Sequence, residues 1–266
     1  MTPPRARGTV ALRARRRDAV SVLDSLRMSG SLKVLFPRAR VSDGIEALLV
    51  NTAGGITGGD AFVLEATATQ ASHLTLTTQA AERVYRSTSG HGKVDTRLVA
   101  EPGAQLKWLP QELIFFDGGA LHRSLHVDLA ADARLLMVEP VVFGRTAMGE
   151  TVHSGQFRDH IRIDRAGKPL YRDALNITGD FRAALHRKAG MAGAGAMASL
   201  VYVAPDAEAH LDAVRAHLPP TGGASLLAED VLCLRLIALD SFELRRALVP
   251  VLERLNQGEL PVSWRL

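Results

Sequence analysis

Short runs in which apolar and polar residues alternate constrain the fold of this chain more than any other feature. In residues 121–129 (LHRSLHVDL), one strand face would carry Leu121, Arg123, Leu125, Val127 and Leu129, and the other His122, Ser124, His126 and Asp128. The alternation recurs in residues 73–78 (HLTLTT) and 160–164 (HIRID), with turn residues at Pro102-Gly103 and Gly118-Gly119 between such runs. The first two thirds therefore predict an all-β sheet, sandwich or solenoid, and no fixed-period repeat chooses among them.

The last third of the chain has strand patterns followed by helix patterns. Residues 197–204 (MASLVYVA) read as a strand, and Asp206 lies where a helix N-cap is expected. Residues 231–239 (VLCLRLIAL) read as a second strand, and Asp240 then precedes apolar residues at helical spacing over 240–255. This pattern predicts a small strand–helix part with about two helices.

Two further features bear on this part of the chain. Pro250 is expected to kink or shorten the second helix, because proline lacks an amide hydrogen. Residues 189–198 (AGMAGAGAMA) could form a flexible linker or a tight packing site, and a mobile loop is favoured because alternating glycine and alanine supply little side chain to bury.

The composition bounds the class of protein. With 266 residues, 47% of them hydrophobic and 23% charged, the chain can form one large or two small domains with a sizeable core. Its one cysteine, Cys233, lies among Val231, Leu232 and Leu234, which excludes an intrachain disulfide and favours an inert thiol in a reducing cytoplasm. No apolar run reaches about 18 residues and the N-terminal segment lacks a signal-peptide pattern, so we expect a soluble, cytoplasmic protein without membrane contact.

The charge pattern argues against nucleic acid as a partner. The formal net charge is only +4, although Arg13, Arg15, Arg16 and Arg17 form a local basic run. Nucleic-acid binders normally add interleaved aromatic residues or a known module, and only 5% of this chain is aromatic. The run is interpreted as a solvated segment or as a contact for an acidic partner.

A glycine-rich segment, residues 51–60 (NTAGGITGGD), admits two interpretations. A phosphate-binding loop would need a helix start and usually a lysine, whereas this segment continues into the strand-like AFVLEA, and the carboxylate of Asp60 would repel phosphate. A turn with positive backbone φ, in which Asp60 accepts local backbone hydrogen bonds, needs none of these features. The residues by themselves favour the turn.

Other chemical motifs are weak when taken one at a time. No GxSxG, HExxH or paired CxxC motif occurs. His122 and His126 would lie about 13 Å apart on a strand, too far apart for one metal ion, so they are interpreted as a hydrated strand face. Several charged residues lie in apolar surroundings, where ion pairs are the usual explanation and a functional cavity is the alternative: Glu82, Arg83, Glu112, Asp117, Arg145 and Glu150.

Four segments taken together, and in this order, resemble the UreD family of urease accessory proteins, called UreH in some systems. They are residues 51–60, 77–87 (TTQAAERVYRS), 109–123 (LPQELIFFDGGALHR) and 143–150 (FGRTAMGE). The resemblance is close over residues 30–180 and extends to the last third through its order of strands and helices. Many family members carry Asn-Pro-Pro where this chain has Asn51-Thr52-Ala53. The positions that carry the motifs include Gly54, Gly55, Gly58, Gly59, Asp60, Arg83, Tyr85, Arg86 and Arg145.

The resemblance implies a mostly β fold, with a β-helix-like (solenoid-like) body and a small α/β C-terminal part containing about two helices. We expect one domain over residues 1–266, with the β-rich body at 30–185 and the strand–helix part at 197–260. It further implies a non-enzymatic scaffold that binds UreF and, through it, UreG, within a dimeric heteromeric complex. This complex docks on apo-urease and helps to conduct nickel to the urease active site.

The same resemblance suggests residues for a nickel route. No tightly bound cofactor is expected, only transient nickel(II), because an ion in a relay must leave each station and scattered oxygen ligands release it more readily than a closed His/Cys site. Asp60 and Glu112 are the first candidates to line the route, followed by Glu82, Asp117 and Glu150. Such a bridging protein is also expected to expose apolar surface, to aggregate alone and to be rescued by UreF.

Two other function classes remain open at this point. One is an enzyme that uses the glycine-rich loop for a phosphate or nucleotide ligand, which tight nucleotide binding by the isolated chain would reveal. The other is a carbohydrate-active β-solenoid, which needs two acids about 5 to 10 Å apart in an open groove lined by aromatic platforms. The low aromatic content argues against the second class.

Overall fold

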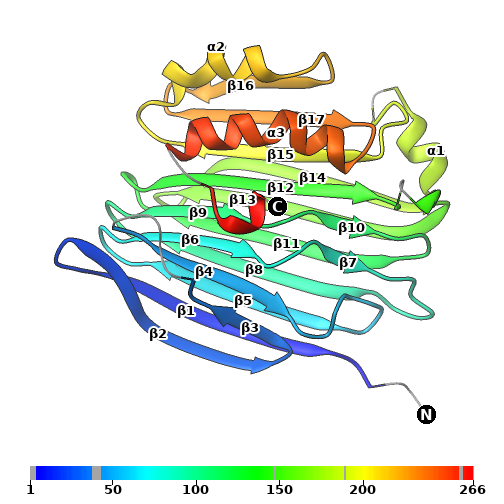
Figure 1. Ribbon diagram of the computed structural model, residues 1–266, viewed down its shortest axis with the longest axis horizontal. Coiled ribbons are helices and arrows are strands. Elements are labelled where there is room, and N and C mark those ends of the chain that lie inside the picture. Colours follow the sequence, from blue (N-terminus) through cyan, green and yellow to red (C-terminus); the bar gives the residue numbers. More distant parts are fainter. Residues whose placement is uncertain (1–3, 38–42, 146–147, 189, 258–259, 266) are drawn as a thin grey trace.

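The computed structural model describes residues 4–37, 43–145, 148–188, 190–257 and 260–265 (Figure 1). The described chain forms two large β-sheets and three α-helices. The seven-stranded sheet has the order β14 (Lys168–Asp180), β13 (Ser154–Arg165), β11 (Ala120–Leu129), β8 (Gly92–Ala100), β5 (Ala61–Ala68), β1 (Arg7–Arg17) and β2 (Val20–Gly30).

The ten-stranded sheet faces the seven-stranded sheet across the core. Its main path is β16 (Gly222–Ala228), β17 (Val231–Ala238), β15 (Ala196–Val203), β12 (Arg134–Phe143), β9 (Gln105–Leu109), β6 (His73–Thr78), β4 (Ile45–Asn51) and β3 (Leu32–Leu35). Two short strands, β7 (Glu82–Val84) and β10 (Leu113–Phe115), pair with each other, and β10 also pairs with β12. The helices are α1 (Phe181–His186), α2 (Ala207–His217) and α3 (Ser241–Asn256), and a 3₁₀ helix spans Val262–Trp264.

The chain winds from one sheet to the other as a solenoid of four turns, β4 with β5, β6 with β8, β9 with β11, and β12 with β13. Strands of successive turns pair in parallel, for example β5 with β8 and β8 with β11, so the colours in Figure 1 progress from blue to green along the stack. Side chains that bond between adjacent turns are 31 residues apart at Asn51–Glu82 and Trp108–Glu139. The predicted mostly β, solenoid-like fold is confirmed.

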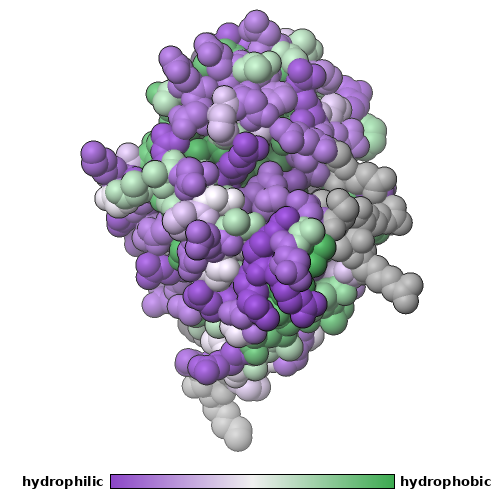
Figure 2. All heavy atoms as spheres, turned by 90° about the vertical axis from the view of Figure 1, so that its left-hand side faces the viewer, coloured by the Kyte–Doolittle hydropathy of each residue, from purple (hydrophilic) through white to green (hydrophobic). Residues whose placement is uncertain are grey.

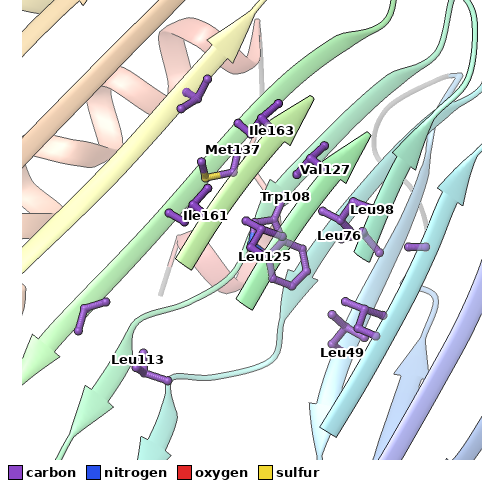
Figure 3. Packing of buried hydrophobic residues seen from close by; sticks show 14 of the residues in the cluster. Leu49, Leu76, Leu98, Trp108, Leu113, Leu125, Val127, Met137, Ile161 and Ile163 are labelled. Carbon is purple, nitrogen blue, oxygen red and sulfur yellow. The ribbon is translucent and has the colours of Figure 1, made fainter. Parts of the chain in front are cut away.

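The alternation in the sequence places one set of side chains between the two sheets. Hydrophilic side chains cover most of the face seen in Figure 2, whereas Figure 3 shows apolar residues of the two sheets pointing toward one another. Leu98, Leu125 and Ile161 come from the seven-stranded sheet and meet Leu76 and Trp108 of the other sheet. These buried contacts hold the two layers together, because apolar surface removed from water contributes about 25 cal/mol per Å².

Helices α2 and α3 cover the outer face of the ten-stranded sheet, whereas α1 packs at β13 and β14. Leu136 and Val138 of β12 belong to a second apolar cluster with Leu248, Leu252 and other residues of α3. Asp240 caps α3, since its carboxylate accepts a hydrogen bond from the Glu243 backbone N–H at 2.9 Å, as predicted. Pro250 does not shorten this helix, which runs through it to Asn256.

Several local predictions need correction. Asp206 precedes α2, but its carboxylate does not cap the helix; it accepts a hydrogen bond from the Tyr202 hydroxyl instead. In the glycine- and alanine-rich segment the expectation of little to bury was wrong, because Met191 and Ala194 are buried against the body. The basic run, by contrast, is solvated as predicted: on β1 the side chains of Arg13 and Arg15 are 48% and 49% exposed, and both pair with Asp24 of β2.

Candidate functional site

The four sequence motifs stack at one corner of the solenoid, one turn above the next. The Tyr85 hydroxyl donates to the Gly54 carbonyl at 3.3 Å, and the Tyr85 ring meets the Phe116 ring edge-on with centroids 5.1 Å apart. On the next turn, Cζ of Arg145 lies 4.5 Å from the Phe116 ring centroid. The segments recognised separately in the sequence are therefore successive corners of one column.

The glycine-rich segment forms the first corner as a tight turn. Gly54 and Gly59 have φ values of 75° and 89°, and a Cβ at Gly58 would lie 2.0 Å from the Ser87 hydroxyl oxygen. The Asp60 carboxylate is buried and accepts backbone hydrogen bonds from Ala6 and Thr57, each at 2.8 Å. The interpretation of this segment as a turn is confirmed, and it leads into strand β5 rather than into a helix.

Three more of the predicted carboxylates bind groups of the protein itself. Glu112 is buried and pairs with Arg245 of α3 at 2.9 Å, which ties the helix layer to the body.

Asp117 and Glu150 lie at the corner column. Asp117 pairs with Arg86 at 2.5 Å and accepts hydrogen bonds from the backbone N–H groups of His153 and Ser154, and although burial opposes the shift, these donors keep its pKa below the usual range. Glu150 pairs with Arg145 at 2.8 Å, and this hydrogen bond lowers the pKa of Glu150.

Glu82, the fifth predicted carboxylate, lines a cavity that is partly open to solvent. The cavity has a volume of about 220 Å³ and lies between the two sheets. Glu82 accepts a hydrogen bond from the Asn51 side chain at 3.0 Å, and burial raises the pKa of Glu82. The wall combines apolar residues of both sheets with a few polar groups, among them Asn51, Thr78, Glu82, Arg83, Thr96, Gln111, Arg123 and Glu139.

Gln111 gives an independent indication that the cavity accommodates a polar occupant. This residue is only 8% exposed, and its side-chain oxygen accepts a hydrogen bond from Arg245 at 2.9 Å. Its side-chain nitrogen is buried and has no hydrogen-bond partner among the described residues. A water molecule or another oxygen ligand in the cavity would satisfy this donor.

A buried cluster of three charged side chains, Arg123, Glu139 and Asp159, forms one wall of the cavity. The Arg123 guanidinium lies 2.5 Å from Glu139 Oε2 through Nη1 and 2.5 Å from Asp159 Oδ2 through Nη2. Arg123 and Asp159 are register partners on β11 and β13, and Glu139 reaches them from β12 of the facing sheet. Trp108 donates its indole N–H to Glu139 Oε1 at 2.6 Å.

Burial sets the electrostatics of this cluster. The side chains of Arg123 and Asp159 are each 10% exposed and that of Glu139 is 4% exposed. Burial lowers the pKa of Arg123 but the two carboxylates raise it, with a net upward shift, whereas burial raises the pKa of Glu139 despite Arg123. One guanidinium thus faces two carboxylates in an otherwise apolar layer.

Beyond Glu139 the polar residues continue through a second, smaller cavity of about 10 Å³, which has room for about one water molecule. Glu139 lines both cavities, and Asp159 lines the smaller one. Asp173 of β14 accepts a hydrogen bond from Ser199 at 3.2 Å and pairs with Arg235 of β17, which reaches the solvent. We call the buried cluster with these three residues the polar seam: Arg123, Glu139, Asp159, Asp173, Ser199 and Arg235.

The sequence prediction missed the polar seam. The signal was nevertheless present, because Arg123 occupies an apolar position of the alternation and Glu139 interrupts an apolar run. Two features of this site lower the stability of the fold. Burial of the ion pairs costs desolvation free energy, and the cavity lacks the packing contacts of a filled core. The arrangement places carboxylate oxygen atoms in the wall of each cavity, with Glu139 shared by both.

Residues considered elsewhere in the sequence have other surroundings. His122 stacks on His91 with ring centroids 3.5 Å apart, while His126 lies 3.1 Å from both Asp128 and Asp164.

The possible metal-ligand atoms of His126, Asp128 and Asp164 lie within 4.8 Å of one another. However, Arg172 and Arg162 bind Asp164 and lower its pKa to about 2, as expected for an ion-pair network. Burial raises the pKa of Cys233 to about 11, in keeping with an inert thiol. Among the described residues, no helix has the length and apolar character needed to cross a membrane.

Comparison with known proteins adds a consistent result. A family model described as UreD urease accessory protein matches residues 6–265. The urease accessory protein UreD of Ruegeria sp. (strain TM1040) is 53% identical over 275 residues, covering 99% of this chain and 92% of the relative. The UreD proteins of Roseobacter denitrificans and Sinorhizobium medicae are 50% and 42% identical, covering 99% and 100% of this chain and 96% and 98% of their own lengths.

Proposed function

Since this chain belongs to the UreD family of urease accessory proteins, we propose that it is a non-enzymatic scaffold of urease maturation. In this proposal it binds UreF and, through UreF, the GTPase UreG, and docks the assembly on apo-urease in the cytoplasm as part of a dimeric heteromeric complex. It also helps to conduct nickel(II) toward the urease active site.

The observation that carries the nickel part of this proposal is the acid-lined cavity that continues into the polar seam. A bare apolar core excludes a divalent cation, and buried carboxylates lower the energy of such an ion. Glu82 and Glu139 offer oxygen ligands at two points of the cavity wall, and Asp159 and Asp173 extend them beyond it. Separate carboxylates with retained water molecules hold an ion weakly enough to release it.

The five carboxylates proposed from the sequence take different places in this scheme. Glu82 is placed to contact a passing ion directly, because it lines the cavity. Asp60, Glu112, Asp117 and Glu150 remain candidates outside the cavity wall, where each binds backbone N–H groups or an arginine. Gln111 and Leu113, the chain neighbours of Glu112, both line the cavity, so replacing Glu112 would also disturb the cavity wall.

The scaffold part of the proposal is supported by apolar side chains on the surface. Met148 and Leu239 are each 75% exposed and Phe242 is 69% exposed, and several hydrophobic side chains also gather in the lower part of Figure 2. Exposed apolar side chains of this size are typical of docking surfaces. We expect the isolated chain to aggregate, and co-expression with UreF to give a soluble complex by size-exclusion chromatography. A soluble monomer that does not associate with UreF would contradict the proposal.

Activation of urease at limiting nickel tests the passage. Glu82→Leu removes a carboxylate from the cavity wall, and Glu65→Leu removes an exposed carboxylate from the outer face of β5 as a matched control. We expect Glu82→Leu to bind UreF and urease normally but to activate less urease, and Glu65→Leu to match the wild type. Equal activation by both variants at equal protein levels would remove Glu82 from the route.

Asp60 requires its own pair of variants, because its carboxylate also holds backbone groups. Asp60→Leu loses both hydrogen bonds and the charge, whereas Asp60→Asn retains one oxygen and a similar volume. A route role predicts intact complexes and reduced activation for the leucine variant, with a smaller loss for asparagine. Full activation by Asp60→Leu at limiting nickel and normal protein level would exclude Asp60 from the route.

A further inference from the structure

Arg123 holds an unusual place for a charged side chain in a passage for cations. It projects from the apolar face of β11, between Leu121 and Leu125, and its side chain is 10% exposed. Its guanidinium contacts Glu139 on one side and Asp159 on the other, and Asp159 receives a second hydrogen bond from Nε at 2.9 Å. Both carboxylates line cavities, so the guanidinium lies between the groups that a passing cation would use.

We propose that Arg123 is an internal counter-ion: its guanidinium occupies the position between Glu139 and Asp159 that a divalent cation would otherwise fill. The passage then releases its cargo instead of storing it, because every ion that binds this carboxylate pair must displace a tethered cation. The inference rests on the proposed function for the passage and for its cargo, nickel(II).

The charges of the polar seam explain why such a counter-ion is needed. Asp173 is matched by Arg235, whereas Glu139 and Asp159 share the single charge of Arg123. Two buried carboxylates with no cation between them repel each other and attract a divalent ion strongly, since a low-dielectric layer screens charges poorly. Without Arg123 the pair would become a binding site that traps the ion.

The arginine side chain at position 123 is well suited to act as a counter-ion for two carboxylates. A guanidinium is planar and spreads its charge over three nitrogens, so it can face two carboxylates on different sides: Nε and Nη2 donate to Asp159, and Nη1 forms an ion pair with Glu139. Trp108 fixes the other oxygen of Glu139, which keeps that carboxylate directed toward Arg123. A lysine would retain the charge, but as a single point donor.

Nickel binding to the purified complex of the full-length chain with UreF tests the proposal. Arg123→Met removes the charge while keeping an unbranched apolar stem, and it should bind about one additional nickel ion per chain. Release of that ion to a chelator should be at least about tenfold slower than release of any nickel bound by the wild type. The matched control is the double variant Arg123→Met/Asp159→Asn, which lacks the same cation but has one carboxylate fewer and should bind no additional ion.

The outcomes separate this inference from the proposed function. A folded Arg123→Met protein that binds no more nickel than the wild type would overturn the counter-ion role, as would equal gains in the single and double variants. Nickel trapping by Arg123→Met with normal urease activation would support the counter-ion role and contradict the proposed nickel route. Trapping together with reduced activation at limiting nickel would support both.

Arg123→Lys keeps the test decisive if the methionine variant does not fold. The ammonium preserves the net charge, so this protein should fold, but it holds the two carboxylates less completely. We expect nickel release from Arg123→Lys to be slower than from the wild type and faster than from a trapping site. Release at the wild-type rate from folded Arg123→Lys would count against the proposal.

Discussion

The two faces of strand β12 contribute to two different layers of the protein interior, one under the helices and one between the sheets. On the outer face, Leu136 and Val138 pack against the helix layer in a cluster made of apolar residues. On the inner face, Met137 and Val141 pack toward the seven-stranded sheet, but Glu139 lies between them, beside a cavity of about 220 Å³. Ten residues of one strand therefore contribute to a filled apolar layer and to a polar, partly empty one.

The difference indicates which layer serves stability and which serves function. The outer layer gains most of its free energy from apolar burial and close packing, and the Glu112–Arg245 ion pair adds one link to the body. The inner layer contains a buried guanidinium and two buried carboxylates, an arrangement that similar apolar residues can replace without loss of stability. A polar interior that does not maximise stability is in keeping with the passage proposed above.

Truncation in the outer layer should have the largest effect. Leu252 of α3 is fully buried, and Leu252→Ala should lower the free energy of unfolding by about 2–5 kcal/mol through lost burial and a new cavity. Urea unfolding followed by circular dichroism measures this change in the soluble complex or the isolated chain. The exposed neighbour Glu253→Ala is the control, and similar values for the two variants would mean that α3 does not pack as described.

Replacing the charged residues of the inner layer by apolar ones should raise the free energy of unfolding, opposite to the effect of Leu252→Ala. The triple replacement Arg123→Met, Glu139→Leu and Asp159→Leu removes the whole buried cluster, and should raise the free energy of unfolding by about 1–4 kcal/mol. The same variant should fail to support urease activation at limiting nickel. A clear loss of stability would show that the cluster is a structural element and not a functional one.

The N-cap of α3 provides a smaller change in the outer layer. Asp240→Ala removes the side-chain acceptor of the Glu243 amide and should lower the free energy of unfolding by about 1 kcal/mol. Asp240→Ser keeps an acceptor and should recover most of this loss. Thermal unfolding of the three proteins under one set of conditions gives the comparison, and equal midpoints for alanine and serine would contradict a capping role.

The smallest effect on the free energy of unfolding is expected for Glu82 in the cavity wall, and this effect should depend on pH. Burial raises the pKa of Glu82 above its value in the unfolded chain, so the protonated form favours folding. Its contribution to stability is fully present below the unfolded pKa of about 4.3 and is lost as the pH rises through the folded pKa.

Glu82→Gln should therefore exceed the wild type in stability at neutral pH, by less than about 1 kcal/mol, and match it near pH 4. Unfolding curves at several pH values measure this difference, with Glu65→Gln on the exposed face of β5 as the control. A constant offset across the pH range would show that the charge of Glu82 is not the cause.

The sequence by itself determined that the first two thirds are β-rich, placed strands at residues 73–78, 121–129, 160–164, 197–204 and 231–239, and indicated where α3 begins. These features follow from local rules: period-two alternation at residues 121–129, and an aspartate placed to accept the amide hydrogen of Glu243. The four ordered motifs also determined the family, although each segment had only a structural explanation when taken alone.

The tertiary structure alone decided which charges meet. Partners between adjacent turns are 29 residues apart at Ser124 and Asp95 but 36 apart at Arg123 and Asp159, so no fixed period in the sequence aligns them. Glu139 reaches Arg123 from the opposite sheet, a contact that depends on how the two layers face each other. Alternation assigns Arg123 to an interior face and an apolar run surrounds Glu139, but only the packing of the sheets brings these residues together beside a cavity.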